Sequence, residues 1–289
     1  MSLSATGAVS RWAWFDGAVV PAEEVLVSAF DRTLVYGLGA FETFRIMSGR
    51  PFRLDRHLQR LRSSLTALAL PVPDGVAELP AGVVALARQA GVREALCRVT
   101  VTAGPAPGDE SLAASAGGAH VIARLRPIPE APRPAVAGLA EFAHDARSPL
   151  AGVKSTSYLV HYLLHERARA AGRLDDLMVD DDGGVREGTV SSLFAVLDGQ
   201  LVTPPLSAGI LAGVTRGTIL ELAEGRVPWR EGALSVDDLQ RVSEVFLTGA
   251  GKGLVSLDEV AGRVLPAARP VAETLSAALR ACIERECGG

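Results

Sequence analysis

The sequence predicts an α+β protein with two domains. Segments that alternate like β-strands and segments with helical periodicity are mixed along the chain, without the regular β–α–β order of a doubly wound parallel sheet. Four prolines within eight residues predict a stiff, extended linker. They are Pro127, Pro129, Pro132 and Pro134. Because 289 residues can bury two cores, we expect an N-terminal α/β domain over 1–126, a linker over 127–135 and a C-terminal domain over 136–289.

The expected N-terminal domain begins with a hairpin and contains two helices. Two short strands within 12–20 flank Asp16-Gly17, a pair that favours hairpin turns. Leucines recur at steps of three and four residues from Leu54 to Leu68, which predicts an amphipathic helix. The other elements expected here are strands over 40–47, 51–54, 96–102 and 119–125, a helix over 82–90 and a loop over 104–118.

The expected C-terminal domain opens with a strand over 136–142 and a helix over 158–171. Five apolar residues should lie on or near one face of that helix, and they are Tyr158, Leu159, Tyr162, Leu163 and Ala168. His161 and His165 have no carboxylate partner in a metal-binding pattern and are expected on the helix surface. The remaining elements expected are strands over 177–179, 193–197 and 244–247 and helices over 215–223 and 271–285.

Composition excludes several classes of protein. The chain has 33 acidic and 29 basic residues, a net charge of −4, whereas a duplex-binding protein would carry a basic excess. No apolar run is long enough to predict a membrane span. The three cysteines are too few and too scattered for a disulfide framework or a zinc site, and residues 1–4 lack the parts of a signal peptide. We therefore expect a cytoplasmic protein without a nucleic-acid, membrane or metal partner.

Two glycine-rich motifs resemble nucleotide sites but fail their templates. Gly37-Leu38-Gly39 lacks the third glycine of a dinucleotide fingerprint and precedes a strand rather than a helix. The turn Gly249-Ala250-Gly251-Lys252-Gly253 lacks the spacing of a phosphate loop, although its exposed amides could hold an anion. Both motifs are therefore expected to serve as turns.

Lysine is nearly absent from this chain. Of the 29 basic residues only Lys154 and Lys252 are lysines, although lysine is usually among the commonest residues. An exposed charge can be an arginine equally well, but only an amine can lose its proton and form an imine with a carbonyl group. Lys154, just before an expected helix, is therefore a candidate for imine chemistry, and Lys252 is the competitor.

Three further positions would suit a pyridine cofactor that carries a phosphate. A carboxylate at Glu187 could keep a ring nitrogen protonated, so that the ring withdraws electrons. Gly213-Val214-Thr215 precedes an expected helix, and helix N-termini favour phosphate groups. Arg60, on the leucine helix, could act as a fork for the same phosphate. Each residue alone is equally consistent with an ordinary surface or loop position.

Taken together and in this order, these segments resemble the class IV (fold type IV) pyridoxal-phosphate enzymes. That family includes branched-chain aminotransferases, D-amino acid aminotransferases, (R)-selective amine transaminases and 4-amino-4-deoxychorismate lyases. The likeness covers nearly the whole chain and rests on Asp31–Gly37 with Phe41–Arg45, His57–Leu61, Lys154, Glu187-Gly188 with Ser191, Leu193 and Phe194, Thr203–Pro205, and Ile210–Arg216. The resemblance implies a small N-terminal α/β sandwich domain, a larger barrel-like α/β domain, pyridoxal 5'-phosphate between them, and a homodimer.

The resemblance also implies a role for individual residues. Lys154 would form the Schiff base with the cofactor and then move the Cα proton of an amino-acid substrate, and Thr43 would assist it. Cofactor contacts are implied for Arg60, Lys154, Tyr158, Glu187, Leu211, Val214, Thr215 and Ala250. Substrate contacts are implied for Tyr36, Phe41, Arg45, Arg98 and Gly251. The chain departs from the family pattern at Leu38, Ser192 and Ala250.

Within that family the motifs favour the lyases. The R-x-H pair typical of D-amino acid enzymes is replaced by Pro105–Gly108, and Thr43 stands where branched-chain enzymes typically carry glycine. A threonine there resembles the lyases, and Arg98 could be a fork for a dicarboxylate substrate. We therefore predict a 4-amino-4-deoxychorismate lyase, which releases pyruvate and 4-aminobenzoate. The alternative is a branched-chain-type or other amino-acid transaminase that uses 2-oxoglutarate and glutamate.

Overall fold

The chain folds into two compact units. The computed structural model describes residues 10–106, 118–143 and 145–288, so most of the predicted loop 104–118 lies outside the described residues. Unit 1 comprises Met1–Ile128, Val153–Tyr158 and Ile283–Gly289, and unit 2 comprises Pro129–Gly152 and Leu159–Cys282. The short segment that carries Lys154 thus belongs to the unit built mainly by the N-terminal part of the chain.

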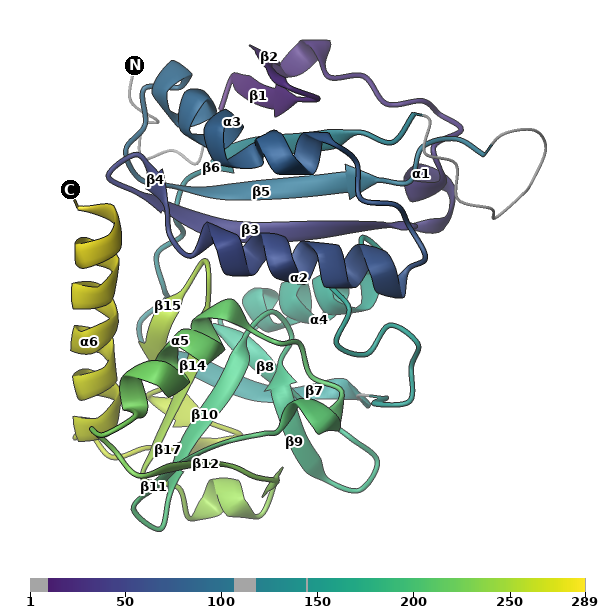
Figure 1. Ribbon diagram of the computed structural model, residues 1–289. Coiled ribbons are helices and arrows are strands. Elements are labelled where there is room, and N and C mark those ends of the chain that lie inside the picture. The colour runs from purple at the N-terminus through teal and green to yellow at the C-terminus, as the bar shows by residue number, and fades with distance from the viewer. Residues whose placement is uncertain (1–9, 107–117, 144, 289) are drawn as a thin grey trace. The chain divides into compact units, whose positions relative to one another are not determined.

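Unit 1 is an antiparallel sheet of six strands with two helices on one face (Figure 1). Its strands, in the order β2-β1-β6-β5-β3-β4, are β1 Trp12–Phe15, β2 Ala18–Pro21, β3 Gly39–Met47, β4 Arg50–Pro51, β5 Ala95–Thr102 and β6 Val121–Arg126. Its helices are α1 Arg32–Tyr36, α2 Leu54–Ala67 and α3 Gly75–Gln89, with a short 3-10 helix over Ala22–Glu24. Helix α3 begins at Gly75, well before the start predicted at residue 82. The predicted helix is too short because Pro80, a residue that usually ends helices, lies inside the real one.

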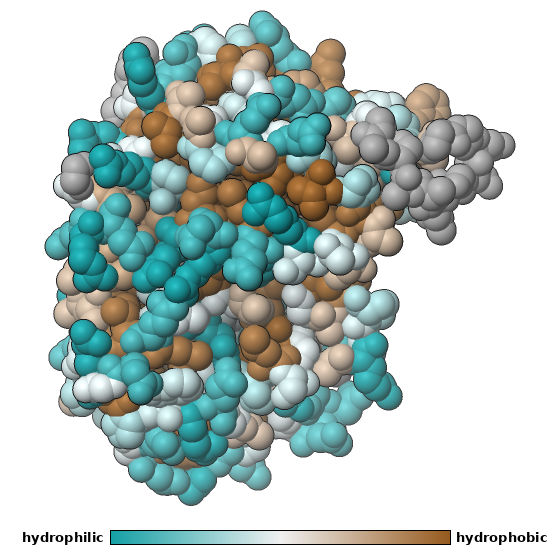
Figure 2. Space-filling view, in the orientation of Figure 1, coloured by the Kyte–Doolittle hydropathy of each residue, from teal (hydrophilic) through white to brown (hydrophobic). Residues whose placement is uncertain are grey.

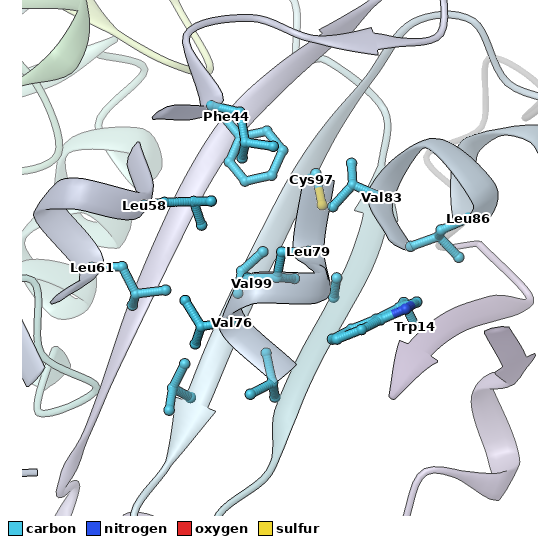
Figure 3. Packing of buried hydrophobic residues seen from close by; sticks show 14 of the residues in the cluster. Trp14, Phe44, Leu58, Leu61, Val76, Leu79, Val83, Leu86, Cys97 and Val99 are labelled. Atoms are coloured by element: carbon cyan, nitrogen blue, oxygen red, sulfur yellow. The ribbon is translucent and has the colours of Figure 1, made fainter. Parts of the chain in front are cut away.

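The core of unit 1 lies between the sheet and helices α2 and α3. Helix α2 contributes Leu61, helix α3 contributes Leu79, and the strands contribute Phe44 and Cys97 (Figure 3). All four side chains are fully buried. Truncating one such leucine to alanine typically costs about 2–5 kcal/mol, so this layer fixes both helices on the sheet.

Strand β3 presents two chemically different faces. Ala40 and Phe44 belong to the core beneath the helices. Because side chains alternate along a strand, Phe41, Thr43 and Arg45 lie on the opposite face. The site residues predicted in this strand are therefore on the face that points away from α2 and α3.

Residues 154–156 run antiparallel beside the first residues of β3. The amide of Phe41 donates to the carbonyl of Lys154 at 3.0 Å, and the amide of Thr156 donates to the carbonyl of Gly39 at 2.9 Å. A Cβ atom at Gly39 would lie 2.8 Å from a carbonyl oxygen of β5. Gly37 ends α1 with a left-handed φ of 69°. In the Gly37-Leu38-Gly39 motif, Gly37 thus allows the helix to end and Gly39 allows the strands to pack closely.

Unit 2 contains two sheets that share one core. The first, in the order β13-β9-β8-β7-β16-β17, comprises β7 Val136–Ala143, β8 Asp175–Val179, β9 Gly184–Gly188, β13 Leu234–Ser235, β16 Glu259–Val260 and β17 Arg263–Val264. The second, in the order β12-β11-β10-β14-β15, comprises β10 Ser192–Leu197, β11 Gln200–Thr203, β12 Trp229–Glu231, β14 Glu244–Gly249 and β15 Gly253–Ser256. Leu177 and Val185 from the first sheet share the core with Leu193 and Leu247 from the second.

Three α-helices follow in the second half of the chain. They are α4 Leu159–Ala170, α5 Val214–Ala223 and α6 Pro270–Cys287, with short 3-10 helices over Leu206–Ala208 and Asp238–Gln240. Each α-helix begins within one residue of its predicted start. The mixture of antiparallel and parallel strand pairs with helices confirms the predicted α+β class.

Helix α4 turns a different face inward than its apolar pattern predicts. The apolar residues that it exposes are Leu159, Tyr162 and Leu163. Leu164 and Ala168 are buried, and His161 and His165 are half-buried on the same side. Nδ1 of His161 lies 2.9 Å from the carbonyl oxygen of Thr189. The prediction of surface histidines is therefore wrong, because a polar segment of unit 2 packs against them.

Hydrophilic residues cover most of the face shown in Figure 2, with smaller hydrophobic patches between them. Among the helices in the described part of the chain, none is long and apolar enough to cross a membrane. In unit 1, several exposed apolar side chains cluster around α1. We call this cluster the α1 patch, and it consists of Leu26, Val27, Phe30, Leu34, Val35 and Tyr36.

Candidate active site

The side chain of Lys154 lies near two aromatic rings. Its Nζ atom is 4.5 Å from the ring centroid of Phe41 and 5.6 Å from that of Tyr158. The two rings meet edge to face, with 5.0 Å between their centroids. The amide of Lys154 donates to Oγ of Ser64 on α2 at 3.1 Å. Backbone pairing and aromatic contacts thus hold this amine in one place, as nucleophilic chemistry requires.

The ring of Phe41 also carries a second cation. Cζ of Arg98 lies 3.7 Å from the Phe41 ring centroid, and Arg98 lies opposite Thr43 in the register of β3 and β5. No carboxylate among the described residues pairs with Arg98. Burial lowers the pKa of Arg98 to about 10, and the charge of Arg124 adds to this effect. A half-buried guanidinium beside Lys154 without a carboxylate partner is suited to bind an anion.

Arg60 is held by a buried carboxylate on the neighbouring strand. Glu42 on β3 has no exposed surface and accepts hydrogen bonds from Nε and Nη2 of Arg60 at 2.7 and 2.8 Å. Nδ1 of His57 lies 2.7 Å from the same carboxylate. Burial alone would raise the pKa of Glu42, but Arg60 and then His57 outweigh it and hold the pKa at about 2. Glu42 is therefore ionised at neutral pH and fixes the plane of the Arg60 fork.

In unit 2, the carboxylate of Glu187 meets the segment that leads into α5. Both of its oxygens accept from the amide of Leu211, at 3.3 and 3.2 Å, and Glu187 is only 7% exposed. Helix α5 begins at Val214 without a side-chain cap from Gly213, so the amides of its first turn suit an anion. A Cβ atom at Gly213 would lie 2.5 Å from Oγ of Ser192. Glycine thus lets the helix end approach β10 closely.

The second lysine, Lys252, bonds a buried carboxylate. Its Nζ donates to Oδ2 of Asp175, which has no exposed surface. The same carboxylate accepts from Oγ of Ser191 at 2.6 Å and from the amide of Thr189 at 3.1 Å. Burial would raise the pKa of Asp175, but the charge of Lys252 and hydrogen bonds from His165, Lys252 and Ser191 keep it well below its usual range. This Asp175 network, comprising Asp175, Thr189, Ser191 and Lys252, ties the turn after β14 to the connection between β9 and β10.

The predicted site residues fall into two groups, one in each unit. In unit 1, contacts around a single aromatic ring join Phe41, Arg98, Lys154 and Tyr158. Also in unit 1 are Arg60 beside Glu42, Thr43 and Arg45 on the face of β3 that points away from α2 and α3, and Tyr36, 57% exposed, at the end of α1. In unit 2, Glu187 contacts Leu211, Val214 and Thr215 begin α5, and Ala250 and Gly251 lie in the turn after β14.

The sequence analysis assigns no role to two carboxylates that the structure shows to be important, Glu42 and Asp175. Glu42 lies inside one of the motifs that carry the family resemblance. It is two residues from both Ala40 and Phe44, so it lies on the same buried face of the strand. A charge on a buried face indicates a partner of opposite charge. Asp175 carries no such signal. Its partner Lys252 lies 77 residues away in the sequence, so only the folded chain reveals the pair.

Comparison with known proteins identifies the family of the chain. The class IV amino-transferase family matches residues 39–260. The branched-chain-amino-acid aminotransferase of Salmonella typhimurium is 30% identical over 264 residues, which cover 86% of this chain and 84% of that protein.

Solved structures give the same result. The branched-chain aminotransferase of Thermoproteus uzoniensis, determined with norvaline, matches with a TM-score of 0.86 and 29% identity over 96% of both chains. A hypothetical aminotransferase from Mycobacterium tuberculosis in its PLP-bound form matches with a TM-score of 0.81 and 27% identity, over 95% of this chain and 99% of that one.

The fold is that of the fold type IV aminotransferases, and the chain is an enzyme. The chain belongs to the class IV aminotransferase family. The family resemblance that the motifs predict is therefore confirmed.

Proposed function

We propose that the chain is an amino-acid transaminase of the branched-chain type, which moves an amino group between an amino acid and 2-oxoglutarate. One observation carries the proposal: Lys154 and Arg98 contact the same ring of Phe41. The amine that would react with the cofactor and the guanidinium that would bind a substrate carboxylate are thus separated only by the ring of Phe41. The similar proteins are aminotransferases, which favours the alternative in the sequence analysis over the predicted lyase.

The cofactor is pyridoxal 5'-phosphate, and the donor groups present fit it. Lys154 supplies the amine, Glu187 supplies a buried carboxylate for a protonated ring nitrogen, and the uncapped start of α5 suits a phosphate. When bound, the cofactor draws electrons away from the Cα–H bond of the substrate. The residues that we assign to it are Arg60, Lys154, Tyr158, Glu187, Leu211, Val214, Thr215 and Ala250.

Two of these residues do distinct work. Lys154 would be the base that takes the proton from Cα of the substrate and passes it on in the transfer of the amino group. The rings of Phe41 and Tyr158 keep its Nζ close to one position. Arg60 brings positive charge to the phosphate, and Glu42 keeps its guanidinium from rotating.

The substrate side is assigned to the face of β3 and β5 that points away from α2 and α3. Arg98 would bind the side-chain carboxylate of glutamate and 2-oxoglutarate, because no carboxylate of the described chain neutralises it. Thr43, directly across from Arg98, would assist proton transfer. The other substrate contacts that we propose are Tyr36, Phe41, Arg45 and Gly251.

We also propose a homodimer that works in the cytoplasm. In the α1 patch, Phe30 and Leu34 are 79% and 70% exposed, and apolar patches of this kind favour association. The three cysteines are too few and too scattered for a disulfide framework, as in proteins of reducing compartments. Light scattering should give the mass of a dimer, and Phe30→Asp should shift it toward the monomer.

A spectrum tests the lysine assignment. The protein with its cofactor should absorb at roughly 410–430 nm, where lysine-bound pyridoxal phosphate is expected. Lys154→Ala should lose that band. Lys154→Arg should lose it too, because arginine keeps the charge but cannot form the bond. Retention of the band in either variant would overturn the assignment.

An assay separates the two activities. We expect the protein to form glutamate from 2-oxoglutarate when a branched-chain amino acid is added. Release of pyruvate and 4-aminobenzoate from 4-amino-4-deoxychorismate, without any added keto acid, would instead support the lyase and overturn the transaminase.

A further inference from the structure

Three arginines line up on the face of the unit 1 sheet that points away from α2 and α3. Arg98 on β5 lies directly opposite Arg124 on β6, and Arg126 lies two residues further along β6. Val99 and Leu125, which alternate with them, belong to the core beneath the helices. Directly opposed Cβ atoms in a sheet lie about 5 Å apart and diagonal neighbours about 7 Å apart. We call Arg98, Arg124 and Arg126 the arginine strip.

The arginine strip has no carboxylate partner within the described residues. Arg124 and Arg126 are exposed, and no acidic side chain there pairs with either of them. Burial and then the charges of Arg124 and Arg126 lower the pKa of Arg98. Partial burial of the base of the Arg126 side chain, and then the charge of Arg124, lower the pKa of Arg126. Like charges placed opposite each other in a sheet are unfavourable. A bound anion would relieve this repulsion.

The strip starts at the proposed reaction centre, since Arg98 and Lys154 contact the same ring of Phe41. We propose that Arg124 and Arg126 extend the carboxylate site of Arg98 into a second anion subsite, which selects substrates whose side chain carries two negative charges. This inference rests on the proposed function, because it assigns the strip to the substrate of the reaction at Lys154.

Counting the charges of the side chain gives the expected order of substrates. A branched aliphatic side chain offers the strip no anion, and glutamate offers one carboxylate, which Arg98 binds. A side chain with two carboxylates, such as that of γ-carboxyglutamate, can pair with Arg98 and with Arg124 or Arg126. An additional pair at an exposed position strengthens binding by up to about fivefold. Among acidic substrates, two negative charges in the side chain should therefore be preferred to one.

The first test is binding by unreactive probes, measured by calorimetry on the full chain with its cofactor. We expect tricarballylate, with three carboxylates, to bind about fivefold more tightly than glutarate, with two. Arg124→Gln and Arg126→Gln should each weaken tricarballylate about fivefold and glutarate less than twofold. Arg88→Gln removes the same charge from α3, on the opposite face of the sheet, and should change neither affinity.

Three results would overturn the subsite. The first is equal affinity of tricarballylate for the unchanged protein and both strip variants. The second is an equal loss in Arg88→Gln, which would indicate a general effect of net charge. The third is a weaker dimer in Arg124→Gln or Arg126→Gln with unchanged tricarballylate binding, which would make the strip part of an interface between copies.

The second test is turnover. The ratio of kcat/KM for γ-carboxyglutamate to that for glutamate should fall about fivefold in Arg126→Gln and stay constant in the control Arg88→Gln. An unchanged ratio would contradict the inference. Because tricarballylate binds without turnover, strip-dependent binding by a protein that transaminates no amino acid would refute the proposed function and leave the anion subsite intact.

Discussion

The guanidinium of Arg60 and the carboxylate of Glu42 form two parallel hydrogen bonds inside unit 1, from Nε at 2.7 Å and from Nη2 at 2.8 Å. Such a bidentate pair fixes the orientation of an arginine as well as its position. The fork proposed to bind the phosphate is therefore oriented by a residue that is itself fully buried.

Glu42→Gln should weaken cofactor binding without unfolding the protein. Glutamine keeps the shape of the side chain, but its amide group cannot accept both donors of Arg60. We expect the dissociation constant of pyridoxal phosphate to rise by about 10- to 150-fold, since a charge-assisted pair of this kind contributes about 1.5–3 kcal/mol. Equilibrium dialysis measures it, with the exposed Glu78→Gln on α3 as the control. An unchanged constant would show that the orientation of Arg60 does not matter.

Acid should destabilise the protein between about pH 4.5 and pH 2. The pKa of Glu42 falls from 4.5 to about 2 on folding, so its ionised form stabilises the native state above the unfolded pKa. This contribution is lost as the pH falls through the folded pKa, and it amounts to about 3 kcal/mol. Urea unfolding at a series of pH values measures the slope. Glu42→Gln should flatten it, whereas a slope of unchanged steepness would assign the acid sensitivity to other groups such as Asp175.

Lys252→Met should destabilise the native state by about 3–5 kcal/mol. The substitution leaves the buried carboxylate of Asp175 without its cation, and breaking a buried pair on one side is costly. Asp175→Asn combined with Lys252→Met removes both charges and should recover part of the loss. Thermal unfolding of the single and double variants checks this coupling. Additive losses in the double variant would mean that the two residues stabilise the protein independently.

Two glycines inside helices should respond to alanine in opposite ways. A Cβ atom at Gly82 in α3 would lie 2.3 Å from Nε1 of the buried Trp14, whereas nothing lies within 4 Å of one at Gly217 in α5. Gly82→Ala should therefore cost about 1–3 kcal/mol through overpacking, and Gly217→Ala should add up to about 1 kcal/mol through helix propensity. Chemical denaturation of both variants tests the pair, and a stabilising Gly82→Ala would contradict the packing around Trp14.

The sequence predicts most elements of unit 1 because their patterns are local. The leucines of α2 and the alternation of β3 are each visible within a dozen residues. The inward face of α4 could not be predicted, because it depends on Thr189, which comes from a distant connection between strands. Propensity and periodicity describe a segment, whereas the choice of its buried face depends on what packs against it.

In the candidate site, too, local features can be predicted from the sequence and contacts between distant segments cannot. The scarcity of lysine singles out Lys154 and Lys252 without any structure. The ion pair between Lys252 and Asp175 joins residues that are 77 positions apart, and the contact of Arg98 with Phe41 depends on the register of two strands. Chemistry that depends on residue type can be found in the sequence, but chemistry that depends on an encounter between distant segments cannot.

The pairing of residues 154–156 with β3 has a consequence for dividing the chain. A polypeptide that ended at Ile128 would contain every strand of the unit 1 sheet but not Val153–Tyr158. The amides and carbonyls of Gly39 and Phe41 that these residues satisfy would then be open to pairing with foreign strands. The piece without Lys154 would therefore be prone to aggregate. Chimeras between relatives should accordingly inherit the lysine segment from the same parent as β3, even though about two dozen residues of unit 2 separate it from Ile128.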